Sequence, residues 1–176
     1  DDPDMPIGEI IELMEGFVRE GKIRYYGGSN YSAERISEGT RYAAEHNLRG
    51  FSAISNMWSP AVQNAGCPLS ADDTLVCFDD SQLDVFRTSS VAFVPYNSTA
   101  KGWFAKRANR IRNERLDSVF ENATNLALLS KLEADAKDAG ISVQTALLRH
   151  IGKYPVQIVP VTSVSSIEQL DDLLSV

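Results

Sequence analysis

Apolar positions along the chain alternate between two spacings, which predict helices and short strands in turn. Near the start, apolar side chains recur with a helical period between Pro6, which suits a first helical turn, and Gly21, which suits a helix end. These side chains are Ile7, Ile10, Ile11, Met14 and Val18. A short apolar strand follows at 22–30, in the stretch KIRYYGGSN. Ser32 then offers an N-cap to a helix at 32–46.

The same order of strand, polar turn and helix recurs along the rest of the chain. Further strands are predicted at 50–56, 91–96 and 156–161, and further helices at 80–88, 124–138, 142–154 and 165–174. A long connection occupies 57–80, and connections of that length are usually functional or disordered. Apolar strands separated by helices pair in parallel through right-handed crossovers. The pattern therefore predicts an α/β fold with a four-stranded parallel sheet in a single domain over residues 1–176.

Polar side chains follow every predicted strand at its carboxyl end, where parallel α/β folds bind their ligands. These clusters are Ser29 and Asn30, Ser55 and Asn56, Tyr96 to Thr99, and Thr162, Ser163 and Ser165. Each cluster taken alone is also explained by turn and cap residues. Because all four clusters occur at the carboxyl ends of predicted strands, together they favour one shared functional surface.

The charge of the chain narrows the classes of function. A net charge of −7 and a pI near 4.8 argue against general binding to nucleic acid or to a membrane surface, because the global field repels phosphate groups. We find no transmembrane run, signal peptide or lipidation motif, and expect a cytoplasmic protein. The segment 101–115, here called the basic island, is rich in Lys and Arg within an acidic chain. It fits either a phosphate-binding site or a solvent-exposed helical face.

Several common chemistries are missing from the sequence. The stretch from Gly27 to Tyr31 fails the GxSxG nucleophile elbow, and neither GxGxxG nor GxxxxGK[ST] is present. Cys67 and Cys77 lack the spacing of a zinc site or a redox dithiol, so no metal site is predicted. His46 and His150 fall on predicted helices away from the strand ends, which favours solvated positions over catalytic ones.

Four stretches resemble motifs of the aldo-keto reductases, in the same order and at the same spacing. GKIRYYGGSN at 21–30 is similar to the GKxRxxGxSN motif that ends the fifth barrel strand of that family, and SNMWSP at 55–60 to its QxxYS. VPYNSTAKGWF at 94–104 is similar to YSPLAxGxL, and VPVTSVSSIEQLDDLL at 159–174 to the closing PGASxxEQLxxN. The resemblance implies the second half of a (β/α)₈ TIM-type barrel, here a four-strand parallel half-barrel with covering helices.

The resemblance also implies roles for individual residues in binding NADP(H). The family positions that hold the nicotinamide carboxamide fall on Ser29 and Asn30, and the position that stacks on the nicotinamide ring falls on Tyr96. A third nicotinamide position, a Gln in the family, falls on Ser55, with Asn56 beside it as a substitute. Pyrophosphate-side and adenosine-side positions fall on Asn97, Thr99, Ser165, Gln169 and Asp172. Lys101, with Ser165 and Gln169, is expected to give NADP(H) its preference over NAD(H), and the closing Asn of the family falls on Leu173.

The catalytic residues of the family have no counterpart in this sequence. They are an Asp, a Tyr, a Lys and a His, all in the first half of the family barrel. The opening segment, DDPDMPIGE, has no initiator Met, as in a fragment or a processed chain. We therefore expect the cofactor half of an oxidoreductase that reduces an aldehyde or ketone when an N-terminal half completes it, and no activity from this chain alone.

Two other functions remain open at this point. A non-catalytic half-barrel would serve as a nucleotide-binding or assembly module, like the potassium-channel β subunits that share the fold, and fold alone does not decide between them. RNA binding through the basic island is the third possibility, which the net charge disfavours. Because half a barrel leaves open sheet edges, we also expect a homodimer or a complementing chain.

Overall fold

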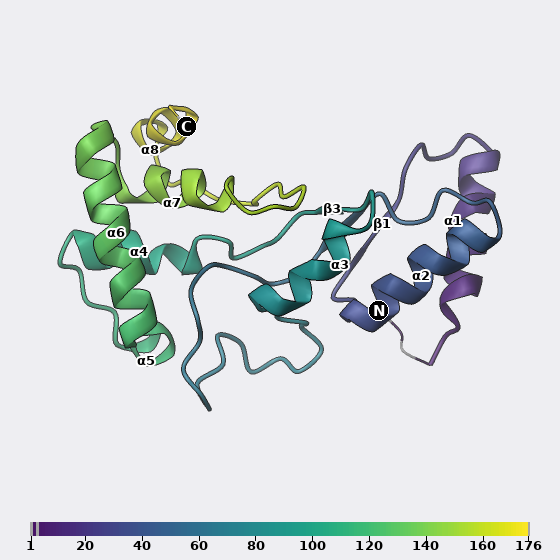
Figure 1. Ribbon diagram of the computed structural model, residues 1–176, viewed down its shortest axis with the longest axis horizontal. Helices are drawn as coiled ribbons and strands as arrows, with labels where there is room; N and C mark the ends of the chain where they lie inside the picture. The colour runs from purple at the N-terminus through teal and green to yellow at the C-terminus, as the bar shows by residue number, and fades with distance from the viewer. Residues whose placement is uncertain (1, 3, 176) are drawn as a thin grey trace. The chain divides into compact units, whose positions relative to one another are not determined.

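The computed structural model describes Asp2 and residues 4–175, and it forms an α/β protein (Figure 1). The elements are α1 (Ile7–Arg19), β1 (Gly27–Ser29), α2 (Ala33–Glu45), β2 (Ala53–Ser55), the 3₁₀ helix η1 (Asp80–Leu83), α3 (Asp84–Arg87), β3 (Ala92–Phe93), the 3₁₀ helix η2 (Ala100–Gly102), α4 (Trp103–Ala108), α5 (Glu114–Phe120), α6 (Ala123–Ala139), α7 (Val143–Ile151) and α8 (Ile167–Leu174). The chain divides into two compact units, and the expectation of a single domain stays a prediction. Unit 1 comprises the segment that ends at Met57, together with Thr74–Pro95 and Pro155–Val159; unit 2 comprises Trp58–Asp73, Tyr96–Tyr154 and the segment from Pro160.

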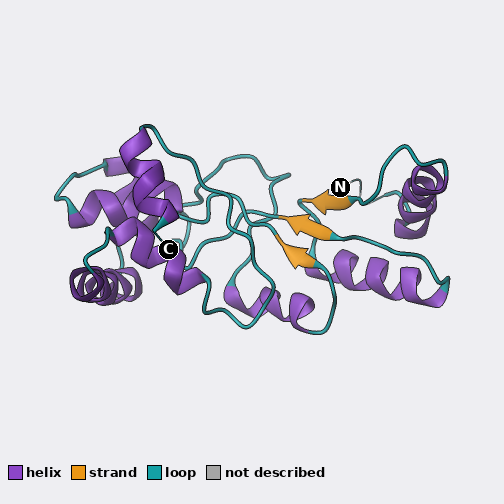
Figure 2. Ribbon diagram, turned by 90° about the horizontal axis from the view of Figure 1, so that it is seen from above, coloured by secondary structure: helices purple, strands orange, loops and turns teal. Residues whose placement is uncertain are grey.

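A parallel sheet with the order β1-β2-β3 forms the centre of unit 1 (Figure 2). The predicted fourth strand is reduced to a bridge between Phe93 and Ile158, in which the Phe93 N–H donates to Gln157 and the Val159 N–H donates to Phe93, both at 2.8 Å. Pro155 and Pro160 flank this segment, and a proline has no N–H to extend a ladder. The parallel α/β architecture is confirmed, whereas the sheet in the described residues has three assigned strands, with the Phe93–Ile158 bridge at the place of the predicted fourth.

The first strand is shorter than predicted because its leading residues complete a helix end. The N–H groups of Lys22 and Ile23 donate to the Phe17 carbonyl, at 3.0 and 3.5 Å, so these residues belong to the turn after α1. Only Gly27 to Ser29 pair with β2. A Cβ on Gly27 would lie 2.4 Å from the Ala53 carbonyl oxygen, so glycine permits the close approach of the two strands.

The core of unit 1 lies between the sheet and its helices. α1 packs against α2, and Ile7, Ile11 and Ile36 are fully or almost fully buried. Phe86 and Phe93 stack at a centroid distance of 4.6 Å, and Phe78 lies 5.9 Å from Phe93. Of the apolar residues that the period of the first predicted helix picks out, Ile7 and Ile11 are buried, whereas Ile10, Met14 and Val18 are partly exposed.

A buried carboxylate ties α1 to the segments before β1 and β2. Glu15 is 6% exposed, and its Oε1 accepts hydrogen bonds from the Tyr26 hydroxyl at 2.9 Å and from the Arg49 N–H at 3.0 Å. Burial, and next the hydrogen bond to Glu15, raise the pKa of Tyr26, so its hydroxyl stays protonated and donates. Through these two hydrogen bonds, one residue of α1 holds the segments that precede β1 and β2 in place.

Unit 2 is helical, with α6 packed against α7 and α4 against α5, α6 and α7; the axes of α6 and α7 cross (Figure 1). Trp103 and Phe120 are 1% exposed, and Leu132 and Leu147 are fully buried. The Trp103 indole N–H donates to Asp117 Oδ1 at 3.0 Å, which satisfies a polar atom inside this core.

Candidate functional site

The carboxyl ends of β1 and β2 bring together three of the predicted nicotinamide residues. The Ser29 hydroxyl donates to the Ser55 carbonyl at 2.8 Å, and the Asn30 N–H donates to the same oxygen at 3.3 Å. Asn30 Oδ1 accepts the Val76 N–H at 3.3 Å. Backbone pairing thus positions Ser29, Asn30 and Ser55 side by side at one edge of unit 1.

Asn56, the fourth predicted residue of unit 1, has a buried oxygen that lacks a partner. Its side chain is fully buried, and its Nδ2 donates to the Tyr31 carbonyl at 2.7 Å. Its Oδ1 accepts no hydrogen bond. An unsatisfied buried acceptor costs about 1–3 kcal/mol, so Asn56 lowers the stability of unit 1 at this point.

Unit 2 contains a hollow of about 720 Å³ that five predicted cofactor residues line. They are Asn97, Thr99, Lys101, Ser165 and Gln169. Lys106 also lines the hollow, and no Asp or Glu does so among the residues that the structure describes. Two ammonium groups without a neighbouring carboxylate favour an anionic ligand.

One side of the hollow is formed by a strained turn between β3 and α4. Asn97, Ala100, Lys101 and Gly102 have φ angles of 57°, 51°, 51° and 76°, all left-handed. The Lys106 ammonium donates to the Lys101 carbonyl at 2.9 Å and so braces the turn. Strain of this kind in non-glycine residues collects at functional sites.

Another side of the hollow is formed by the segment that leads into α8. The Ser165 N–H donates to Gln169 Oε1 at 2.8 Å, and the Gln169 N–H donates to the Ser166 hydroxyl at 3.3 Å. These bonds form the N-terminal cap of α8 and fix Ser165 and Gln169 together at the hollow.

Asp172 and Tyr96 do not line this hollow. Asp172 Oδ2 accepts the hydroxyl protons of Ser142 and, at 2.8 Å, of Thr145, at the start of α7. Burial by itself would raise the pKa of Asp172, but the bonds from Ser142 and Thr145 outweigh it and hold the pKa below the ordinary value. Tyr96 is half-buried, and its carbonyl accepts the Trp58 N–H at 3.2 Å. Their cofactor roles stay predictions.

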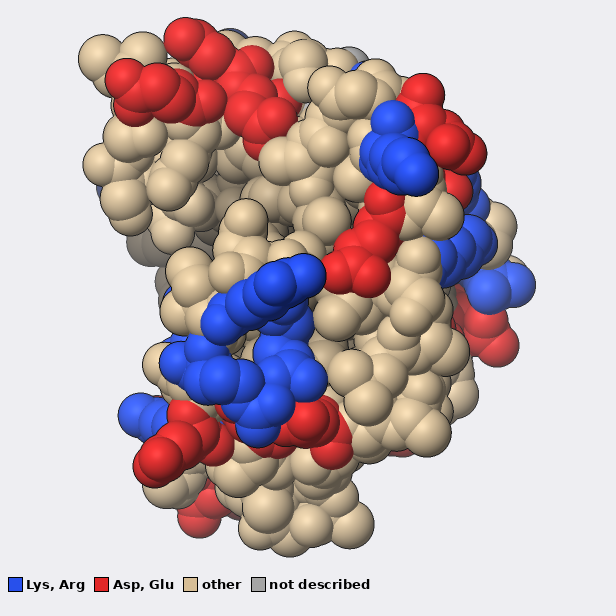
Figure 3. Space-filling model, turned by 90° about the vertical axis from the view of Figure 1, so that its left-hand side faces the viewer, with Lys and Arg blue, Asp and Glu red and all other residues tan. Residues whose placement is uncertain are grey.

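The basic island at 101–115 separates into two kinds of cation. Arg107 and Arg112 both pair with Glu121, at 3.0 and 2.9 Å, and Arg112 also pairs with Asp117 at 3.0 Å. In Figure 3 a group of Lys and Arg side chains is bordered by Asp and Glu side chains. Lys101 and Lys106 are the members of the island that line the hollow.

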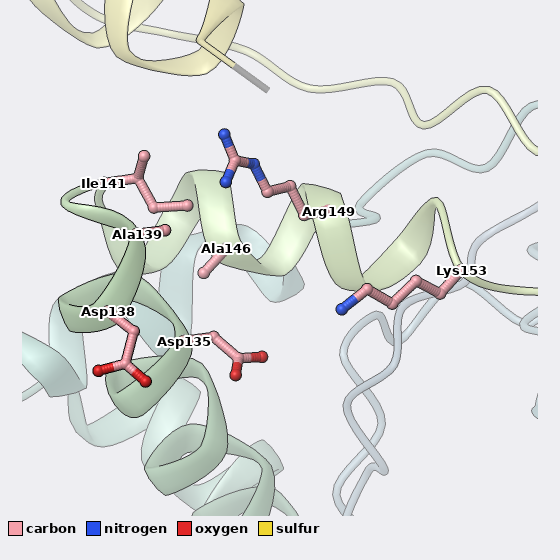
Figure 4. A pocket seen from close by; sticks show the side chains of 7 residues that line it. All are labelled: Asp135, Asp138, Ala139, Ile141, Ala146, Arg149 and Lys153. Carbon is pink, nitrogen blue, oxygen red and sulfur yellow. The ribbon is translucent and has the colours of Figure 1, made fainter.

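A second hollow in unit 2, of about 330 Å³, carries charges of both signs (Figure 4). Asp135 and Asp138 extend from α6, while Arg149 on α7 points away from both carboxylates. Lys153 completes the charged lining, and none of the four side chains is buried. Because the two signs offset each other at the surface, this hollow is a weaker candidate for an anionic ligand.

The larger hollow also has lining residues that the sequence did not predict as cofactor-binding, among them Lys106 and Gln144. Lys106 belonged to the noticed basic island, whereas nothing in the sequence set Gln144 apart. Within the described part of the chain, no group of His, Cys, Asp and Glu side chains could hold a metal ion. None of the helices in that part combines the length and apolar character that crossing a membrane requires.

Comparison with known proteins identifies relatives along the whole chain. The profile of the "Aldo/keto reductase family" matches residues 1–176. Norsolorinic acid reductase B of Aspergillus parasiticus is 22% identical over 93% of the chain and 41% of its own length. The protein of the same name from Dothistroma septosporum is 24% identical over 62% of the chain and 24% of its own length. The chain thus spans less than half of either relative.

Solved structures of the same family share the fold. An aldo/keto reductase from Klebsiella pneumoniae, in complex with NADP and acetate, superposes with a TM-score of 0.59 and 22% identity. The superposition covers 98% of this chain and 49% of that protein.

Proposed function

The chain belongs to the aldo/keto reductase family of oxidoreductases, and we propose that it supplies the NADP(H)-binding part of a carbonyl reductase. The observation that carries this proposal is the hollow of unit 2, where Lys101 and Lys106 stand without a lining carboxylate. Its volume of about 720 Å³ suits part of a dinucleotide, since ligand sites measure about 300–1,000 Å³.

The residues of the hollow fit the phosphorylated end of NADP(H). Lys101 and Lys106 would neutralise phosphate charge, and the hydroxyls of Thr99 and Ser165 would donate hydrogen bonds to phosphate oxygens. The family member from Klebsiella pneumoniae was solved with NADP, which supports the same choice for this chain.

In unit 1, the residues at the ends of β1 and β2 are the ones proposed for the nicotinamide carboxamide. Ser55 stands where the family has a Gln, and Asn56 beside it is fully buried, so Ser55 is the more accessible of the two. The Ser29 and Asn30 side chains lie at the same strand ends. Bound NADPH supplies the hydride, and the chain orients the cofactor that carries it.

A non-catalytic nucleotide-binding module is the second candidate. The observation that favours it is the lack of a counterpart for the family's catalytic Asp, Tyr, Lys and His in these 176 residues. Without a general acid, carbonyl reduction loses about 10²- to 10⁴-fold, so we expect this chain alone to bind the cofactor without reducing aldehydes or ketones.

Fluorescence titration of the full chain with NADPH and NADH tests the proposal. We expect tighter binding of NADPH, and a loss in the variant Lys101→Ala that is largest at low salt, because Lys101 is exposed and its charge is screened. Lys131→Ala, an exposed substitution on α6, is the matched control and leaves binding unchanged. Absence of NADPH binding, or equal affinity in wild type and Lys101→Ala, would contradict the proposal.

A further inference from the structure

The turn that follows β1 carries Ser29 and Asn30 and packs back against its own strand. Asn30 has a left-handed φ of 58°, which bends the chain directly after the strand. The ring of Tyr31 then lies against Gly28, where an added Cβ would be 2.7 Å from two of the ring atoms. The glycine leaves room for the ring, so the shape of the turn depends on how Tyr31 is held.

Tyr31 is held by two buried residues that lie on either side of β2 in the sequence. Its ring is 7% exposed and lies 5.2 Å from the ring of Phe51, between centroids. Its carbonyl accepts a hydrogen bond from Asn56 Nδ2 at 2.7 Å. The residues that flank β2 therefore set the position of the turn after β1.

Asn56 acts at this place through the nitrogen of its amide. The side chain is fully buried, so it does not reach a ligand itself. Its Oδ1 accepts no hydrogen bond, which costs stability, whereas its Nδ2 holds the Tyr31 carbonyl. A leucine of similar size would avoid the unsatisfied oxygen and would lose the hold on Tyr31. The donor is thus what the amide contributes.

Resting on the proposed function, we propose that Asn56 is a positioning residue for the nicotinamide end of the cofactor. By holding the Tyr31 carbonyl, it fixes the two residues just before it, Ser29 and Asn30, where the carboxamide binds. Groups that bind a ligand have to be held to within about 0.5 Å, and neighbouring hydrogen bonds provide that hold. The phosphorylated adenosine end belongs to unit 2 and does not depend on Asn56.

The test compares two dissociation constants, measured by calorimetric titration of the full chain with NADPH and with adenosine 2′,5′-bisphosphate, which lacks the nicotinamide. In Asn56→Leu we expect NADPH to bind about tenfold more weakly, which corresponds to about one hydrogen bond. The constant for adenosine 2′,5′-bisphosphate stays unchanged. Asn56→Ala removes the same donor without adding bulk, and we expect the same two results.

The comparison separates positioning from general damage, because misfolding weakens both ligands together. Thr40→Val is the control, since it removes one hydrogen bond of unit 1, to the Ile36 carbonyl within α2, and keeps both constants. Equal weakening of both ligands, or unchanged NADPH binding in both Asn56 variants, overturns the inference. Binding of adenosine 2′,5′-bisphosphate that depends on Lys101 still leaves the proposed function standing. Failure of wild type to bind NADPH overturns both.

Discussion

At the residue scale, left-handed backbone coincides with predicted cofactor positions. Asn30, Asn97 and Lys101 have φ angles of 58°, 57° and 51°. Asn tolerates this conformation because its short side chain bonds locally, whereas a lysine there costs about 1–2 kcal/mol. Because Lys101 is exposed, packing does not account for the strain. Its charge at the hollow gives a functional reason to retain it.

The variant Lys101→Gly should separate stability from binding. Glycine adopts positive φ without a steric penalty, so we expect the free energy of unfolding in urea to rise by about 1 kcal/mol while NADPH binding weakens. Lys101→Ala is the matched control, since it removes the charge and keeps the strain. A destabilised Lys101→Gly would show that the lysine side chain supports the fold instead.

Also at this scale, the Tyr26 hydroxyl is expected to stabilise unit 1 through Glu15. Tyr26→Phe leaves Glu15 with one fewer hydrogen bond in a buried place, at a cost of about 1–3 kcal/mol in the free energy of unfolding. Tyr25→Phe, which changes a neighbour that is 69% exposed, serves as control and should have no effect. Equal urea midpoints for the two variants would contradict this role.

At the element scale, helices were predicted better than strands. Ser32 and Ser142 cap α2 and α7 as their sequence positions predict, each accepting an N–H three residues on. α5 was missed because it starts at Glu114 inside the basic run, where charge hides the apolar period of Leu116, Val119 and Phe120. The strands are shorter than predicted because neighbouring residues form helix-end turns or are prolines, which cannot donate to the sheet.

The residues of the candidate site were also predicted unevenly. Residues after predicted strands could be found from their position, and five of them line one hollow. Gln144 lies on the first turn of α7, and no motif or spacing in the sequence marks it as a lining residue. The hydrogen bond between Thr145 and Asp172 joins two helices, so the sequence could not predict it. Sequence alone therefore identified the strand-end residues and missed the contribution of helix faces.

α8 is attached to α7 by few groups, and Asp172 is expected to be the main one. Leu173 is the buried residue of α8, whereas Ile167 and Leu174 are more than 70% exposed. In Asp172→Ala, hydrogen exchange of α8 amides should accelerate while α1 keeps its protection. Because the pKa of Asp172 is lowered in the folded state, its contribution is present above the pKa of the unfolded chain and is lost as pH falls through the folded pKa.

The wild-type protein should therefore lose its advantage over Asp172→Ala in acid. We expect the difference in unfolding free energy between the two to be largest near neutral pH and to shrink below about pH 4, where an ordinary Asp protonates. A difference that stays constant from pH 7 to pH 3 would assign the effect to lost packing alone.

At the scale of the whole molecule, the chain is expected to associate with a second chain. Within the described residues β1 pairs with β2 alone, so its other edge is open, and an open edge recruits further strands. We expect a homodimer or a complex with a complementing chain, and sedimentation velocity at micromolar concentration measures it. A stable, folded monomer would defeat this expectation.

Amide chemical shifts of the ¹⁵N-labelled full chain report residue by residue whether NADP(H) binds in the hollow of unit 2. On titration with NADPH, we predict the largest shifts at Thr99, Lys101, Ser165 and Gln169, with saturation. The amides of Asp138 and Arg149 at the second hollow should not move. Shifts confined to the second hollow, or none at saturating NADPH, would rule out NADP(H) binding in the larger hollow.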